Sequence, residues 1–131
     1  IKPVLAVCVG MQLLTDSSDE GPGVGLGWIP GTCRRFTPDP TTGLKVPHMG
    51  WSDIAPTRDD LVIGSEVNQR YYFVHSYYVE CSAEHIIATC DYGLPFAAAV
   101  RRERVWGVQF HPEKSHRFGL ELLRRFVEAP C

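Results

Sequence analysis

No segment of this sequence is apolar for long enough to cross a membrane. The longest apolar run lies around residues 95–100, whereas a membrane-spanning helix needs roughly 20 residues. Basic charge is not in excess either, since 13 Lys and Arg stand against 15 Asp and Glu and the formal net charge is -2. This balance gives no electrostatic reason to expect binding to nucleic acid or to a membrane surface.

The cysteines match neither a disulfide framework nor a zinc site. Their number, five, is odd, and no two are spaced as C-x-x-C. Free thiols in a reducing compartment are therefore favoured, and we expect a cytoplasmic protein. No secretory signal is visible, and the sequence begins with Ile1, so we expect a fragment or a processed chain. The five are Cys8, Cys33, Cys81, Cys90 and Cys131.

Length and composition predict one globular domain over residues 1–131. Hydrophobic residues make up 44% of the chain and charged residues 21%, which is ordinary for a folded protein and argues against disorder. The 12 glycines and 10 prolines predict many turns, so an all-helical bundle is not expected.

The first half of the chain predicts a strand, a tight turn and a helix. Residues 3–8 (PVLAVC) form an apolar run of strand length, and a helical pattern begins at residues 11–15. Residues 16–31 are rich in Gly, Ser and Pro and predict a loop. Residues 32–36 are compatible with a strand, and residues 45–54 with either a strand or a loop.

The second half predicts more strands and a closing helix. Aromatic and β-branched residues favour a strand over residues 70–80, and three further runs at 86–92, 96–101 and 104–110 predict an antiparallel meander. In the final helix, Leu120, Leu123 and Val127 form an apolar stripe, and Leu122 and Phe126 add an i, i+4 pair beside it. Ser115 is a candidate N-cap. The whole pattern predicts an α/β fold with a mixed sheet and flanking helices.

Cys8 is the first candidate for chemistry. It ends an apolar strand just before a helix, and its neighbours at Ala6 and Gly10 are small, as a nucleophile on a sharp turn requires. Partial positive charge at the helix start would lower the pKa of the thiol. The alternative is a buried, chemically inert cysteine, which is a common fate of this residue type.

His111 and Glu113 are the second candidate. His111 follows an apolar strand, and Pro112 fixes the backbone between the two residues. A histidine that deprotonates a thiol needs a carboxylate to orient its ring, and Glu113 can provide it if the chain turns at the proline. The alternative is an ordinary strand-end histidine and a helix-leading glutamate. Together with Cys8, these residues would give a nucleophile, a base and an orienting group at one sheet edge.

Two further segments are open to two interpretations. The strand at residues 72–77 is interrupted by His75 and Ser76, which either contact a small polar substrate or include one satisfied core histidine. Trp51, beside Met49 and Gly50, is either a core residue or an exposed anchor for a partner.

Four segments, in order, resemble the class I (triad-type) glutamine amidotransferases. They are AVCVGMQ at 6–12, PHMGW at 47–51, YFVHSY at 72–77 and GVQFHPEKS at 107–115. The second segment narrows the resemblance to the glutaminase subunits of imidazole glycerol phosphate synthases, in histidine biosynthesis. The resemblance implies a flavodoxin-like α/β fold and hydrolysis of glutamine to glutamate and ammonia. It implies no metal or organic cofactor.

The resemblance also implies roles for individual residues. Cys8 would attack the side-chain amide of glutamine, His111 would act as base and then acid, and Glu113 would orient it. The N–H of Val9 would be one oxyanion donor. Residues that would line the substrate pocket are Gln12, Glu20, His75, Ser76 and Tyr77.

A partner is implied in the same way. The ammonia would pass to a (β/α)₈-barrel cyclase, which uses it to make imidazole glycerol phosphate. The face that meets this partner would include Met49, Trp51, Tyr72 and Lys114.

The sequence departs from the family pattern in two places. Ala6 replaces the usual glycine two residues before the nucleophile, and we expect its methyl to crowd the turn. The family also has strands, helices and a Gly-rich loop with a second oxyanion donor ahead of the nucleophile, whereas seven residues precede Cys8 here. Losing one such donor costs about 10²–10³ in rate, so we expect these residues alone to be poorly stable and weakly active. The alternatives are a non-catalytic remnant that keeps only the partner face, or another Cys–His–Glu γ-glutamyl hydrolase.

Overall fold

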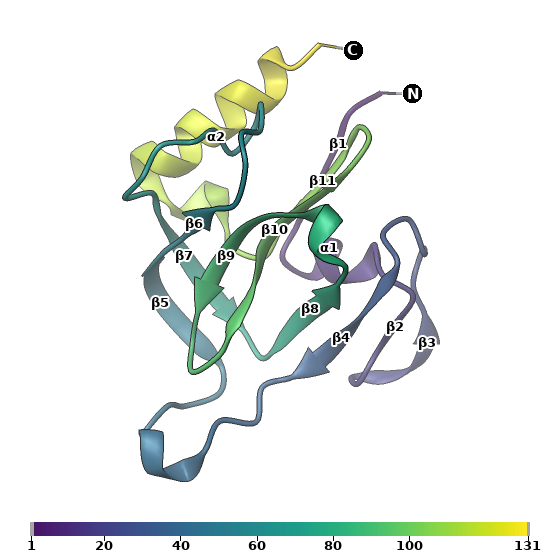
Figure 1. The fold of residues 1–131 in the computed structure, drawn as a ribbon, viewed down its shortest axis with the longest axis vertical. Coiled ribbons are helices and arrows are strands. Elements are labelled where there is room, and N and C mark those ends of the chain that lie inside the picture. Colours follow the sequence, from purple (N-terminus) through teal and green to yellow (C-terminus); the bar gives the residue numbers. More distant parts are fainter. Residues whose placement is uncertain (1, 131) are drawn as a thin grey trace.

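The computed structural model describes residues 2–130 (Figure 1). Within them, two α-helices accompany three sheets of short strands, so the α/β prediction is confirmed. None of these helices is long and apolar enough to cross a membrane. The helices are α1 (Val9–Leu13) and α2 (His116–Glu128), and short 3₁₀ turns are η1 (Pro40–Thr42), η2 (Ala83–His85) and η3 (Pro112–Lys114).

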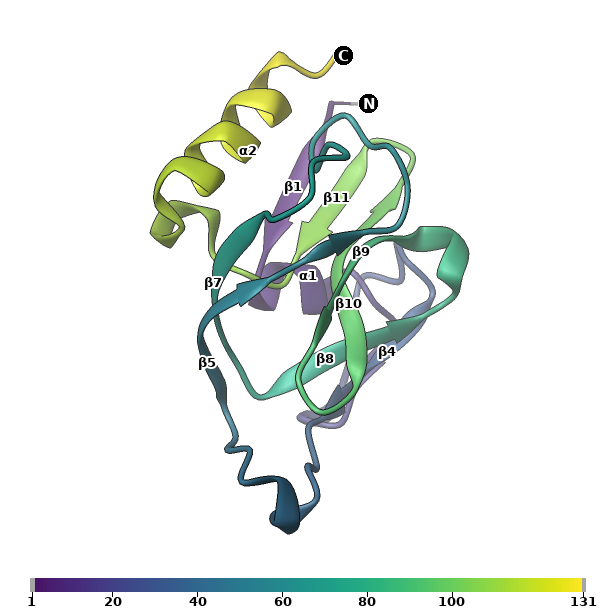
Figure 2. The same ribbon diagram turned by 60° about the vertical axis from the view of Figure 1, so that its left-hand side comes forward.

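The largest sheet positions the candidate site. Its five strands lie in the order β1-β11-β10-β9-β6. The parallel pair β1–β11 aligns Val7 with Val108, and β1 is the edge strand (Figure 2). The predicted antiparallel meander is confirmed as β9–β10–β11. The strands are β1 (Val4–Val7), β6 (Ala55–Pro56), β9 (Ile86–Asp91), β10 (Pro95–Arg102) and β11 (Val105–Val108).

Two smaller sheets use the rest of the chain. One has the order β3-β2-β4-β8, and the other pairs β5 with β7. The predicted strand at residues 70–80 is broken at Ser76, so its halves β7 and β8 belong to different sheets. The strands are β2 (Ser17–Ser18), β3 (Gly21–Val24), β4 (Gly31–Arg35), β5 (His48–Asp53), β7 (Arg70–His75) and β8 (Tyr77–Cys81).

The prediction of a loop over residues 16–31 is wrong in part. Ser17 pairs with Thr32 of β4 on one side and with Val24 of β3 on the other. The four residues of β3 are all exposed, so backbone pairing with β2 forms this strand without burial of an apolar face. Residues of this kind carry no apolar alternation, which is why composition alone predicts a loop.

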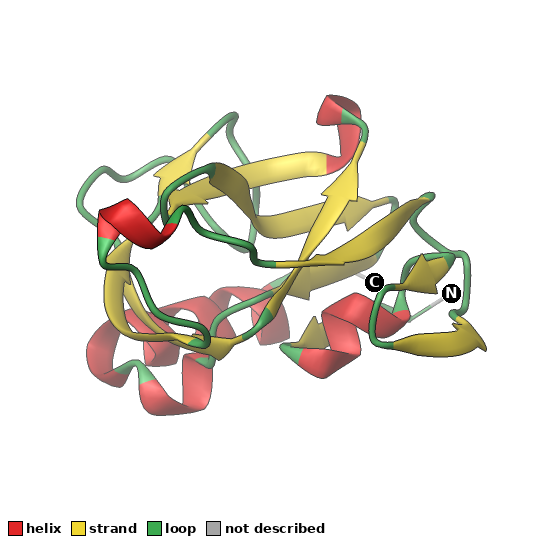
Figure 3. Ribbon diagram, turned by 90° about the horizontal axis from the view of Figure 1, so that it is seen from below, coloured by secondary structure: helices red, strands yellow, loops and turns green. Residues whose placement is uncertain are grey.

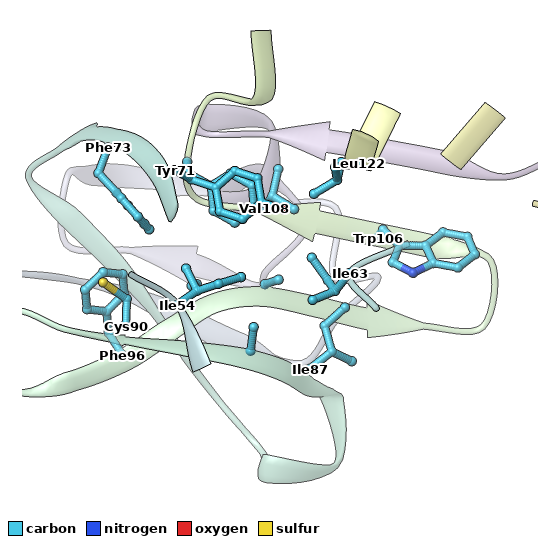
Figure 4. Close-up of a cluster of buried hydrophobic side chains, with 14 of the residues drawn as sticks. Ile54, Ile63, Tyr71, Phe73, Ile87, Cys90, Phe96, Trp106, Val108 and Leu122 are labelled. Carbon is cyan, nitrogen blue, oxygen red and sulfur yellow. The ribbon is translucent and has the colours of Figure 1, made fainter. Parts of the chain in front are cut away.

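Two apolar clusters lie on opposite faces of the five-stranded sheet. On one face, Trp106 and Val108 pack with Leu122 of α2 (Figure 4). On the other, Met11 and Leu14 pack with Val100 of β10. Gly107 allows this second contact, because a Cβ there would lie 2.9 Å from the Met11 side chain and 3.0 Å from that of Leu14. The helices therefore flank the sheet, as Figure 3 shows from below.

The closing helix is confirmed, and it packs through the predicted pair Leu122 and Phe126 rather than through the whole predicted stripe. Leu120 and Val127 are exposed, whereas Leu122 is buried and Phe126 packs against Trp106. The helix begins at His116, which has a φ of 48°. Apolar periodicity alone does not show which of two adjacent apolar stripes faces the sheet.

Candidate active site

Cys8 occupies a strained turn between β1 and α1. Its φ of 55° and ψ of -108° are unusual for a residue with a side chain, and such strain is typical of functional sites. The Cys8 N–H donates to the Val108 carbonyl at 2.8 Å, which extends the β1–β11 pairing by one residue. The Cys8 carbonyl then accepts from the Gln12 N–H at 3.3 Å and begins the helix.

Ala6 fits this turn without crowding. A Cβ built on Gly10 would lie 3.5 Å from the Ala6 methyl, which is ordinary van der Waals contact. The expected crowding between Ala6 and residue 10 is therefore absent, since even a Cβ at residue 10 would make only an ordinary contact with the Ala6 methyl.

The side chains of His111 and Glu113 are hydrogen-bonded in the turn after β11. Nδ1 of His111 lies 2.8 Å from Oε2 of Glu113, the contact that fixes the ring of a catalytic histidine. The imidazole is largely enclosed, with 18% of its side chain exposed, whereas the carboxylate is 55% exposed. Pro112 opens η3 between them and brings the two side chains together.

Ser115 clamps this turn to β7. Its hydroxyl donates to the His111 carbonyl at 2.6 Å and accepts from the Tyr72 N–H at 2.9 Å. Ser115 occupies the N-cap position of α2, as predicted, but its side chain makes no capping bond to that helix. Its buried hydroxyl instead holds the backbone that carries His111.

Cys8 and His111 lie against the same stretch of β7. The Cys8 thiol donates to the Val74 carbonyl at 3.8 Å, and the backbone N–H of His111 donates to the Tyr72 carbonyl at 2.9 Å. These two carbonyls are two residues apart on one strand, a spacing of about 7 Å. Gln109, two residues before His111, also reaches the Cys8 sulfur, at 3.8 Å. Cys8 and His111, with Glu113 bonded to the His111 ring, therefore lie at one sheet edge.

Burial raises the pKa of the Cys8 thiol above its ordinary value. The Val9 N–H and the Gln109 amide lower the pKa, Glu113 raises it and Lys114 lowers it, and burial outweighs the lowering groups. The expectation of a lowered pKa is thus wrong for the chain alone. The helix α1 has only five residues, and its short dipole does not compensate for the loss of solvent.

A surface hollow of about 240 Å³ lies beside the nucleophile turn. Three of the predicted substrate-pocket residues line it, namely Val9, Gln12 and Glu20. Thr15 and Ser17 line it as well and give it polar groups. The hollow therefore offers a carboxylate and amide groups within one small concave surface, next to Cys8 in the chain.

The other three predicted pocket residues take different positions. The His75 ring is buried, and both of its nitrogens are paired, Nδ1 with the Tyr77 carbonyl at 2.8 Å and Nε2 with His48 at 3.0 Å. Its side chain is a satisfied core histidine, and it is not free to bind a ligand. Ser76 and Tyr77 are half-buried, and the Tyr77 carbonyl accepts from the Gln12 side chain at 3.2 Å.

The predicted partner residues gather on one face of the β5–β7 hairpin. Trp51 pairs with Tyr72 across the strands, and Met49 pairs with Val74. Met49 is 61% exposed and Trp51 42% exposed, so Trp51 is not a core residue. Lys114 is exposed in the adjoining turn η3. Because the Val74 carbonyl also accepts from the Cys8 thiol, this face adjoins Cys8.

Sequence reasoning gives no role to Gln109 and does not reveal the contacts of the Ser115 hydroxyl with His111 and Tyr72. Gln109 is fully buried at the end of an apolar strand, and strand alternation places it on the same side as Gly107 and His111. A polar residue at a buried position of an apolar strand indicates a functional contact, so this pattern could have identified Gln109.

This chain is similar in sequence to a known protein family. The family model of the class-I glutamine amidotransferases matches residues 1–129. The chain belongs to the class-I glutamine amidotransferase family.

Within this family, the chain is similar in sequence to subunits of one kind of synthase. The chain is 50% identical over 129 residues to the imidazole glycerol phosphate synthase subunit HisH of Bdellovibrio bacteriovorus, and 50% identical over 128 residues to that of Leptospira interrogans. These matches cover 96% and 95% of this chain, and 63% of each relative. The chain thus spans less than two thirds of the length of these relatives.

Solved structures share the fold at much lower identity. A putative GMP synthase component from Thermoplasma acidophilum superimposes with a TM-score of 0.65 at 17% identity, covering 95% of this chain and 55% of that one. A glutamine amidotransferase structure gives a TM-score of 0.65 at 19% identity, covering 96% and 59%. The predicted amidotransferase-type α/β fold is therefore confirmed.

Proposed function

We propose that this chain carries the glutaminase chemistry of an imidazole glycerol phosphate synthase. The observation that supports it most directly is the convergence of Cys8 with the His111–Glu113 pair at one sheet edge, in a family named for glutamine amide transfer. The substrate would be glutamine, and the products glutamate and ammonia. Two relatives that are 50% identical carry the name of that synthase's HisH subunit.

The first half-reaction would transfer the γ-glutamyl group to sulfur. Because burial keeps the Cys8 thiol protonated, its proton must pass to His111 as the sulfur attacks the side-chain carbonyl of glutamine. Glu113 stabilises the resulting imidazolium through its 2.8 Å contact. The Val9 N–H, which contacts the sulfur, would donate to the oxyanion. His111 then protonates the leaving nitrogen, ammonia departs, and a γ-glutamyl thioester remains.

The second half-reaction would hydrolyse this thioester. His111, neutral again, removes a proton from water as the oxygen attacks the thioester carbonyl. Collapse of the second tetrahedral intermediate releases glutamate and returns the proton to the Cys8 sulfur. Glutamine and water are thereby converted to glutamate and ammonia, and the protein is unchanged.

Gln12 and Glu20 would hold the amino-acid end of the substrate. Glu20 supplies a carboxylate for the α-ammonium group, and both residues line the hollow beside Cys8. The Gln12 nitrogen already donates to the Tyr77 and Gln109 carbonyl oxygens, which leaves its own oxygen as the acceptor available to a substrate. Ser76 and Tyr77 would contact the substrate through their backbone.

The partner would be a (β/α)₈-barrel cyclase, bound as a heterodimer in the cytoplasm. The hairpin face carrying Met49, Trp51 and Tyr72, with Lys114 beside it, supports this proposal, since exposed aromatic residues are enriched at interface hot spots. Transfer of ammonia to this partner would give the complex its lyase reaction.

Two variants test the assignment. Cys8→Ser and His111→Asn should each abolish glutamine hydrolysis, measured as glutamate release with and without the cyclase, while circular dichroism stays that of the parent chain. Normal hydrolysis by either variant would overturn the triad. Cyclase binding by the parent chain without turnover would identify a remnant, and preference for γ-glutamyl peptides would identify a different hydrolase.

A further inference from the structure

Gln109 lies deep in the molecule with its amide directed at the nucleophile. The residue is fully buried, and its Nε2 lies 3.8 Å from the Cys8 sulfur. An amide nitrogen can only donate, so the sulfur is the acceptor in this contact. A donor of this kind stabilises sulfur more strongly when it carries a negative charge.

The orientation of the Gln109 amide is fixed by its neighbour Gln12. The Gln12 nitrogen donates to the Tyr77 carbonyl at 3.2 Å and to Oε1 of Gln109 at 3.3 Å. Because the Tyr77 carbonyl can only accept, the group facing it must be the Gln12 nitrogen. That nitrogen in turn requires an oxygen from Gln109, which leaves the Gln109 nitrogen pointing to Cys8.

The same carbonyl joins this chain of hydrogen bonds to a buried histidine pair. Nδ1 of His75 must donate to the Tyr77 carbonyl, so Nε2 of the neutral ring accepts from Nδ1 of His48 at 3.0 Å. Nε2 of His48 then accepts from the Ser52 hydroxyl at 2.9 Å. The hydrogen-bond partner of each ring fixes its tautomer. The series of hydrogen bonds is continuous from Ser52 on β5 to Cys8.

We propose that Gln109 stabilises the thiolate of Cys8, and that Gln12, the Tyr77 carbonyl and the His75–His48 pair hold it in position for this. The inference deepens the proposed glutaminase function and rests on it for its catalytic meaning. Gln109 contacts the reacting sulfur itself, whereas His75 and His48 act through other groups and are positioning residues.

Opposing contacts at the sulfur explain why such a donor matters. The Val74 carbonyl accepts from the thiol at 3.8 Å and so favours the protonated form. Burial and the Glu113 carboxylate also raise the pKa of Cys8, whereas the Val9 N–H, the Gln109 amide and the Lys114 ammonium lower it. Among the lowering groups, Gln109 is the buried side chain. Its loss would leave the backbone donor and a surface charge.

The test compares two buried glutamines. Gln109→Met removes the donor at nearly constant volume, and Gln69→Met is the matched control, because Gln69 is also buried but bonds to Ile63, Glu66 and Tyr71. In the full chain, the rate of Cys8 alkylation by iodoacetamide is followed against pH by peptide-resolved mass spectrometry. This readout separates Cys8 from the other cysteines and needs no glutamine turnover.

Gln109→Met should raise the pH midpoint of Cys8 alkylation by about one unit, and lower the rate about tenfold below that midpoint. His48→Phe, which removes a positioning residue, should lower the rate about twofold. Gln69→Met should leave the midpoint unchanged. An unchanged midpoint in Gln109→Met, or an equal shift in Gln69→Met, would overturn the proposal.

A measurement on the parent chain covers the case in which Gln109→Met does not fold. The side-chain amide resonance of Gln109 should shift with pH at the midpoint of the Cys8 thiol, and that of Gln69 should not; no shift at Gln109 contradicts the proposal. Absence of glutamine hydrolysis together with the expected thiol shift would reject the proposed function alone. Hydrolysis without the thiol shift would reject the role of Gln109 alone.

Discussion

Two histidines follow similar apolar strands in this chain and end in opposite surroundings. The tetrapeptide YFVH ends at His75 and VQFH ends at His111. His75 is enclosed by Phe36, Phe73 and Phe96, and its nitrogens meet a carbonyl and a neutral ring. His111 meets a carboxylate at a partly open sheet edge. The comparison teaches that the partner of the ring, and not the local sequence, separates a core histidine from a candidate base.

Exchanging each histidine for asparagine should produce crossed effects. His111→Asn should lower the glutaminase rate by about 10³–10⁴, because it removes the proton acceptor, and change the free energy of unfolding by less than about 1 kcal/mol. His75→Asn should lower the free energy of unfolding by about 2–4 kcal/mol, because it leaves buried partners unpaired. Turnover assays and urea unfolding of both variants would check this. Equal effects on activity and stability in the two variants would break the comparison.

Acid should destabilise the fold through the buried pair. Burial lowers the pKa of both His48 and His75 from 6.5 to about 4. Both rings are thus neutral in the folded chain, whereas the unfolded chain takes up protons below about pH 6.5. Stability should therefore fall as the pH drops from about 6.5 to 4, by about 1.4 kcal/mol per unit for each proton.

Urea unfolding at several pH values measures this slope. His75→Asn should have a shallower slope than the parent chain over the same range. A parent chain whose stability is constant between about pH 6.5 and 4 would contradict the assignment of two neutral histidines.

The two faces of the β5–β7 hairpin extend the comparison to aromatic residues. Trp51 is exposed, whereas Phe73 is buried and stacks on His48. Trp51→Ala should weaken cyclase binding by about 2 kcal/mol and leave stability nearly unchanged, and Phe73→Ala should cost about 3–4 kcal/mol of stability. Titration calorimetry and thermal unfolding would check both. Undiminished cyclase binding by Trp51→Ala would remove this face from the proposed interface.

The smallest expected effect concerns backbone strain at Cys8. Cys8→Gly should abolish glutamine hydrolysis and yet raise the free energy of unfolding by about 1 kcal/mol relative to Cys8→Ala, because glycine tolerates a φ of 55°. Denaturant unfolding of the two variants measures the difference. If Cys8→Ala is the more stable of the two, the turn stores no strain.

The sequence predicts the strands and the helix that carry the site, but not the hydrogen bonds between its residues. The strand at residues 3–8, the meander and the closing helix are readable because apolar periodicity follows burial. The break at Ser76, which sends β8 into a second sheet, depends on pairing with β4 far away in the chain. The hydrogen bonds of Gln109 and Ser115 join segments that are up to about a hundred residues apart, so no local pattern reveals them. The roles of Cys8, His111 and Glu113 stay predictions until activity is measured.

The most direct test is to trap the covalent intermediate. The chain, alone and with the cyclase, is incubated with glutamine, quenched in acid and analysed by peptide mass spectrometry. The account predicts a γ-glutamyl adduct on Cys8 and on no other cysteine, and none in Cys8→Ser. Glutamine hydrolysis that proceeds with no adduct in the parent chain, and that persists in Cys8→Ser, would contradict it.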